Sequence, residues 1–233
     1  MRIAHSFKNI GVTFIGQLLA MAIAFPARLI FLENLGTENL GLHSLFTNLI
    51  TLLSLVDLGI GSAIVFSLYK PIAEEDKNKV AGLMKLYKKI YTIIGITVFL
   101  IGIIIMTFLE FIVKEYNGNE NIYIIFWLFI VNTTISYFFV YKKSIIIAHQ
   151  KNYIVNSVHY LYIILTNIFQ MYLLIRYENF IAYLLVQIFF TSLENLTISN
   201  YANKMFPYLK EHISVATDKK IIKELFSNDG LSN

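Results

Sequence analysis

The chain has 233 residues, of which 57% are hydrophobic, a formal net charge of +4 and no cysteine. With a mean hydropathy of +0.63, it is not an ordinary soluble domain, in which the apolar share is lower and interrupted by charges. The absence of cysteine excludes disulfides, thiolate metal sites and cysteine nucleophiles.

The apolar residues gather in six long runs that contain few charges. The runs are residues 10–32, 42–69, 90–113, 122–141, 152–175 and 179–203, and we expect the fourth to continue as helix to residue 147. Each run has about 20 residues or more, enough for a helix to cross the hydrocarbon core of a membrane. None shows the alternation of a transmembrane barrel. We therefore expect an all-α, polytopic membrane protein with six transmembrane helices.

The basic residues mark the ends of these runs. Sixteen of the nineteen Lys and Arg lie before residue 10 or within residues 70–89, 142–151 and 204–223. The loops that alternate with these segments contain only two basic residues, Lys114 and Arg176. Lys and Arg concentrate on the cytoplasmic side of membrane proteins. This pattern predicts that both termini are cytoplasmic and that the protein lies in the cell (cytoplasmic) membrane. It also accounts for the net positive charge without a nucleic-acid partner.

The first span contains an arginine near its outer end, before a short acidic loop at residues 33–39. Gln17 precedes Arg28 by eleven residues, about three helical turns, so both lie on one face. A charge within a span is a candidate functional residue. The shared polar face favours a position of Arg28 in a protein cavity. The alternative is that its side chain extends to the outer membrane surface.

Two carboxylates lie deep within spans. Asp57 is about 18 Å from the cytoplasmic end of the second run, where Gly59 and Gly61 interrupt the helix. It is either protonated, hydrated in a cavity, or satisfied by helix-end dipoles at the break. Glu194 in the sixth run has a similar depth. The alternative for Glu194 is a carboxyl kept neutral by neighbouring Ser and Asn. Glu110 lies near the outer end of its run and is expected to reach the lipid headgroups.

Residues 77–89 read as a basic amphipathic helix. The lysines lie mostly elsewhere around the helix from the apolar residues. The apolar residues repeat at intervals of three and four positions and are Val80, Leu83, Met84 and Tyr87. Such a helix is expected to lie on the anionic inner surface of the membrane. The alternative is a solvated connector.

The fifth run carries polar residues at helical spacing on one side, namely Asn156, His159, Thr166, Asn167 and Gln170. They either line a water-filled path or form hydrogen bonds between helices. The chain has no motif of a zinc protease, phosphate-binding loop or serine hydrolase, and its outer loops are short. We expect neither an enzyme nor a metal or cofactor site.

Three segments in order along the chain carry a resemblance to a known family: 35–42; 55–64 with 67–74; and 141–144 with 150–153. Together they resemble the Wzx-type polysaccharide and oligosaccharide flippases of the multidrug/oligosaccharidyl-lipid/polysaccharide exporter superfamily. Members have two six-helix lobes around a central cavity and move an undecaprenyl-pyrophosphate-linked sugar chain across the membrane by alternating access. The resemblance implies that residues 1–206 form the first lobe. Residues 207–233 are then a cytoplasmic basic connector that ends before a second lobe.

The resemblance also implies partners and roles for residues. The expected partners are the lipid-linked oligosaccharide, membrane lipids, a coupling cation, and a second lobe or polysaccharide-assembly proteins. The candidate substrate-binding residues are Arg28, Gln17, Asn156, His159, Asn167 and Gln170, and the candidates for ion coupling are Asp57 and Glu194. The alternatives are a multidrug or cation exporter of the same superfamily, or a non-transporting half-lobe that acts as an interaction protein or is inert.

Overall fold

The computed structural model describes residues 2–57, 59–113, 116, 118 and 120–210, without the side chains of residues 2–8, 56, 57 and 210. This part of the chain contains helices and no strand, so the all-α prediction is confirmed. The helices are α1 (Arg2–Leu53), η1 (Ser54–Asp57), α2 (Ile60–Ala73), α3 (Lys77–Met106), α4 (Leu109–Ile112), α5 (Ile122–Tyr137), α6 (Val140–Ala148), α7 (Asn152–Tyr177), α8 (Phe180–Met205) and η2 (Pro207–Lys210). Most of the connector expected at 207–233 lies outside the described residues.

Four of these helices are long and apolar enough to cross a membrane: α1 over Asn9–Leu53, α3, α7 and α8. The pair α5 and α6, bent by 40°, is a fifth span if it is counted as one. The helices are therefore compatible with a multi-pass membrane protein. The count of six spans stays a prediction.

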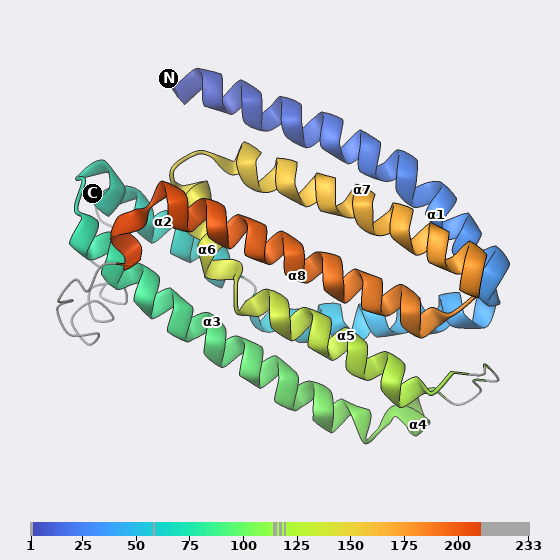
Figure 1. Cartoon of the computed structure of the whole chain (residues 1–233). Coiled ribbons are helices and arrows are strands. Elements are labelled where there is room, and N and C mark those ends of the chain that lie inside the picture. The colour runs from blue at the N-terminus through green and yellow to red at the C-terminus, as the bar shows by residue number, and fades with distance from the viewer. Residues whose placement is uncertain (1, 58, 114–115, 117, 119, 211–233) are drawn as a thin grey trace.

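Helix α1 reverses its direction at a single glycine. Gly36 has φ 79° and ψ 175°, a conformation almost confined to glycine because a Cβ atom would clash with the backbone. Figure 1 shows that the chain turns back there, so that α1 forms two arms. Next to the turn, the Tyr116 hydroxyl donates a hydrogen bond of 2.7 Å to Asn39 Oδ1. The acidic loop expected at 33–39 is thus helical on both sides of one non-helical residue.

The second arm of α1 is interrupted where the sequence predicted. It ends at Leu53 and continues through η1 and Gly59, with φ 89°, before α2 begins at Ile60. Glycine tolerates this positive φ because it has no Cβ atom. The break therefore lies beside Asp57, whose side chain is outside the described part of the structure.

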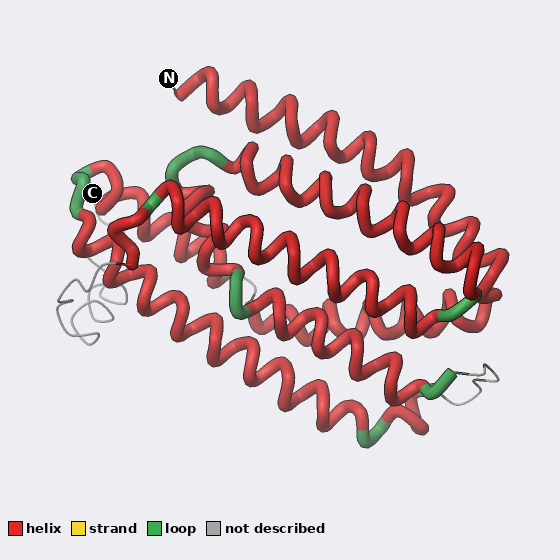
Figure 2. The backbone as a smooth tube through the Cα atoms, in the orientation of Figure 1, coloured by secondary structure: helices red, strands yellow, loops and turns green. Residues whose placement is uncertain are grey.

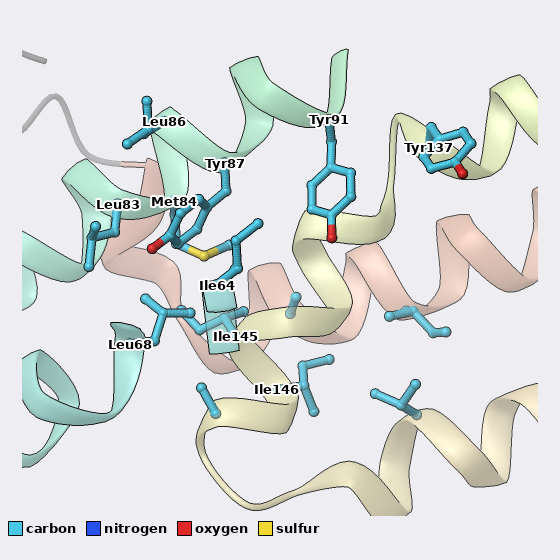
Figure 3. Close-up of a cluster of buried hydrophobic side chains, with 14 of the residues drawn as sticks. Ile64, Leu68, Leu83, Met84, Leu86, Tyr87, Tyr91, Tyr137, Ile145 and Ile146 are labelled. Carbon is cyan, nitrogen blue, oxygen red and sulfur yellow. The ribbon is translucent and has the colours of Figure 1, made fainter. Parts of the chain in front are cut away.

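The amphipathic segment at 77–89 differs from expectation. It is the first half of α3, a single helix of 30 residues, and its apolar face is buried in the protein. Figure 3 shows Leu83, Met84 and Tyr87 directed toward the side chains of α2 and α6. The prediction of a helix lying on the membrane surface is therefore wrong, because this face finds apolar partners within the bundle. Lys85 and Lys88 remain exposed.

The bundle has two chemically different ends (Figures 1 and 2). The N-terminus, the α2–α3 turn, the α6–α7 turn and the end of α8 lie together, and we call this the basic end because it carries Lys70, Lys77, Lys151 and Lys204. The Gly36 turn, α4 and the α7–α8 turn lie at the opposite end. A separate hydrophobic cluster forms the core near each end.

The first arm of α1 packs closely on α7. A Cβ atom on Gly16 would overlap the ring of Tyr160, so glycine permits the two helices to approach. Nearby, Asn156 Nδ2 donates a hydrogen bond of 2.6 Å to Thr13 Oγ1. The large side chains on the other side of this arm stay exposed, for example Phe14 and Phe25 at 64% and 69%. An apolar face of this kind matches contact with lipid tails.

Candidate functional site

A polar groove of about 290 Å³ lies along α7 and α8 in this otherwise apolar bundle. From α7 it is lined by His159, Tyr162, Ile163, Thr166, Asn167 and Gln170, and from α8 by Tyr183, Gln187, Phe190, Thr191 and Glu194. His43 of α1 completes the lining. We call this feature the polar groove.

Helical periodicity places these side chains in line. On α7 the lining positions from 159 to 170 are separated by three or four residues or are neighbours, and the same holds on α8 from 183 to 194. Positions at this spacing share one face of a helix. Eleven residues correspond to about 16 Å along each helix axis. The groove is therefore an elongated path and not a single contact point.

One end of the groove contains a cluster of charged and titratable groups. Glu194 Oε1 lies 3.2 Å from Lys143 Nζ and 3.1 Å from His159 Nδ1. The exposed fractions of the side chains are 12% for Glu194, 27% for Lys143 and 48% for His159. Two nitrogen donors converge on one carboxylate oxygen, an arrangement that an ionised carboxylate accepts. We call these three residues the charge cluster.

The geometry also sets the tautomer of His159. An ionised carboxylate can only accept hydrogen bonds, so the hydrogen between Glu194 and His159 belongs to Nδ1 of the ring. In the neutral imidazole Nε2 is then the acceptor nitrogen. His159 therefore keeps a proton-accepting atom while its other nitrogen is held by Glu194.

Helix α6 brings Lys143 to this site. The bend between α5 and α6 turns the chain toward α8, where Lys142 Nζ donates a hydrogen bond of 2.6 Å to Asn203 Oδ1 and Lys143 reaches Glu194. The sequence predicts that Lys142–Lys151 form a cytoplasmic connection, and a neutral carboxyl is one of the alternatives that it leaves for Glu194. The structure shows instead that Glu194 has a lysine partner from α6.

The other end of the groove is formed by buried polar and aromatic groups. Gln170 is 4% exposed, and its Nε2 donates a hydrogen bond of 3.1 Å to the carbonyl oxygen of Tyr183. The His43 ring packs edge to face on Phe129, with centroids 5.3 Å apart. The guanidinium of Arg28 is near enough to act electrostatically on His43.

The structure brings together four of the predicted site residues and separates the others. His159, Asn167, Gln170 and Glu194 line the groove. Outside the lining, Gln17 and Arg28 are exposed on α1, Asn156 is bonded to Thr13, and Glu110 accepts a hydrogen bond of 2.8 Å from Tyr123. The side chain of Asp57 lies outside the described residues.

Sequence reasoning missed Lys143 and His43. Both are polar residues at the margin of an apolar run, and their contact with α8 depends on the α5–α6 bend and on the reversal of α1 at Gly36. No local pattern reveals either contact. Among the described residues, no group of three or more His, Cys, Asp or Glu is arranged to hold a metal ion.

Comparison with known proteins gives no relative: no family model, curated protein or solved structure matches the chain.

Proposed function

We propose that the chain takes part in exporting an undecaprenyl-pyrophosphate-linked oligosaccharide across the cytoplasmic membrane, as the first lobe of a two-lobed flippase that works by alternating access. The observation that carries the proposal is the polar groove with its charge cluster. Polar and ionisable groups in the interior of a membrane bundle are costly and mark paths for substrates or ions.

The chemistry of the substrate agrees with this arrangement. A pyrophosphate-linked sugar needs hydrogen-bonding and cationic groups along its path, while its lipid tail remains in the bilayer. The groove offers amide, hydroxyl and imidazole groups. Other positions of α7 and α8 are apolar and exposed, for example Leu161, Phe169, Leu185 and Phe189. A polar path beside a lipid-facing surface supports the passage of an amphipathic molecule.

Arg28 is the cation that we assign to the pyrophosphate. It is exposed on α1, and its charge acts on His43 at the end of the groove opposite the charge cluster. Guanidinium groups bind phosphate oxygens in pairs of parallel hydrogen bonds. In this proposal the groove connects a permanent cation near one end with a lysine at the other.

The proposed topology has six spans with the basic end in the cytoplasm. The two arms of α1, α3, the α5–α6 pair, α7 and α8 supply the passes, with the second arm continued through η1 and α2. Lysines lie in or next to the turns at the basic end, as expected for cytoplasmic segments. A second lobe, or proteins of polysaccharide assembly, then covers the groove.

A multidrug or cation exporter is the second candidate. Tyr162, Tyr183 and Phe190 line the groove, and aromatic faces bind organic cations. The carboxylate of Glu194 adds a negative charge but is occupied by Lys143. A drug-sensitive host that gains resistance when it expresses the protein supports this candidate.

The proposal is tested by changing Arg28 and, separately, the groove lining in the cells that carry this chain. Arg28→Ala is expected to abolish surface polysaccharide and to accumulate the lipid-linked precursor, because the pyrophosphate loses its cation. Asn167→Leu with Gln187→Leu makes the middle of the groove apolar and is expected to lower export about tenfold or more, the effect of losing about 1.4 kcal/mol.

The matched control is Ser157→Leu, a polar-to-apolar change on α7 outside the groove lining, at an exposed position. It is expected to leave surface polysaccharide at the native level. Native polysaccharide levels in the Arg28→Ala cells and in the double variant, with each protein present in the membrane, contradict the proposal.

A further inference from the structure

The charge cluster is built so that a single proton changes its net charge. Lys143 and Glu194 form an ion pair across 3.2 Å and cancel one another, while a neutral His159 adds no charge. A second proton on the ring occupies Nε2 and leaves the Nδ1–Glu194 hydrogen bond intact. The cluster then has one net positive charge without any rearrangement of the three side chains.

His159 is also the member of the cluster that a proton from the groove can reach. Its side chain is 48% exposed and lines the groove, whereas Glu194 is 12% exposed. Imidazole is the side-chain group that ordinarily changes its charge between pH 5 and pH 8. Protonation therefore makes this end of the groove attractive to anions, with His159 and Lys143 as the two cations that face Glu194.

We propose that Lys143, Glu194 and His159 form a proton-binding site at this end of the polar groove, and that its protonation creates a binding site for a phosphate-type anion. The inference deepens the proposed function and rests on it for the identity of the anion, the pyrophosphate of the lipid-linked substrate. The charge cluster and Arg28, at opposite ends of the groove, then bind this anion at different stages of its passage. In this proposal the proton is the cation whose binding is coupled to export. A sodium site, by contrast, needs several oxygen ligands, and Glu194 Oε1 already has two nitrogen partners.

Few other titratable groups face His159. From α8 and α6 they are Glu194 and Lys143, and on α7 itself the neighbours are Tyr160 and Tyr162. The part of α1 that passes along α7, residues 9–27, contains no titratable side chain. His43 and Tyr183 line the groove farther along. Glu194 and Lys143 are thus the charged groups nearest to His159 in the described part of the chain.

The test uses the purified chain in nanodiscs of neutral lipid, with histidine labelled by ¹³C for NMR and sulfate as the anion probe. Sulfate keeps its charge over the whole range measured, so any pH dependence belongs to the protein. We expect sulfate affinity to rise about fivefold or more from pH 8 to pH 6, and the NMR signals of the His159 ring follow its protonation over the same range.

Two variants give opposite results if the proposal is correct. His159→Gln keeps a side chain that can donate to Glu194 but cannot gain charge, so sulfate binding is expected to be weak at both pH values. His159→Lys carries a permanent charge and is expected to bind sulfate tightly even at pH 8. A native pH dependence of sulfate binding in His159→Gln, or sulfate binding by the native protein that does not change with pH, overturns the proposal.

The matched control is His149→Gln, a histidine change at the end of α6 and outside the groove lining. Burial lowers the pKa of His149, so its removal is expected to leave the pH dependence of sulfate binding unchanged.

Discs that contain anionic phosphatidylglycerol identify the source of the anion. Loss of sulfate binding in them shows that bilayer headgroups fill the site, and retained binding shows that they do not. No export is measured, so failure here is distinct from failure of the polysaccharide assay.

Discussion

Glu194 has a large energetic influence because it sits between two nitrogen donors in a mostly buried place. Taking a carboxylate and an ammonium out of water costs several kcal/mol for each ion, and their attraction offsets this cost only when both are present. Lys143 retains 27% of its side-chain exposure, which reduces its share of the cost. The pair is therefore more sensitive to the loss of one partner than to the loss of both.

This asymmetry gives a prediction for stability. Glu194→Gln leaves Lys143 without a counter-ion and is expected to lower the free energy of unfolding by as much as about 3 kcal/mol. The double variant Glu194→Gln with Lys143→Met is expected to recover most of this loss. Thermal unfolding in detergent, followed through the fluorescence of the single tryptophan, Trp127, measures both. Equal melting temperatures for the single and double variants contradict the argument.

At the scale of the helices, the reversal of α1 depends on one backbone conformation. Gly36→Ala places a Cβ atom at φ 79° and ψ 175° and is expected to destabilise the protein by about 1–3 kcal/mol. Gly41 offers a matched control in the same helix, because a Cβ atom there has no neighbour within 4 Å. Gly41→Ala is expected to be neutral or slightly stabilising, since alanine is the better helix former. Similar melting temperatures for the two variants exclude a special role of Gly36.

The individual helices show how much of the fold and of the groove could be predicted from the sequence. Long apolar runs predicted the helices and the break beside Gly59, because run length and glycine act locally. Periodicity also predicted the polar face of α7, which supplies His159, Asn167 and Gln170 to the groove. Periodicity could not say what an apolar face packs against, so the first half of α3 was placed on the membrane surface and not in the core. Nor could it predict the α5–α6 bend that carries Lys143 to Glu194.

At the scale of the whole molecule, the contrast between the two ends of the bundle predicts an orientation in a membrane. Lysines at the basic end favour the cytoplasmic side, because cytoplasmic segments of membrane proteins carry an excess of positive charge. The alternation of the turns between the two ends requires an even number of passes if both termini are on one side. Because the chain has no cysteine, single introduced cysteines report the side of each turn without background.

We therefore predict opposite labelling of the two ends by a membrane-impermeant maleimide in intact cells. Cysteines at Thr37 and Glu178, in the Gly36 turn and the α7–α8 turn, are expected to react from outside. Cysteines at Glu75 and Gln150, in the turns of the basic end, are expected to react only after the cells are permeabilised.

The most direct comparison is the matched pair at the two ends of α7, Glu178 and Gln150. If both react from outside, α7 does not cross the membrane and the six-span arrangement is wrong. If only the Gln150 cysteine reacts before permeabilisation, the orientation is inverted. If neither reacts, the α7–α8 turn does not reach the outer surface, and a cysteine at Thr37 shows whether the Gly36 turn does.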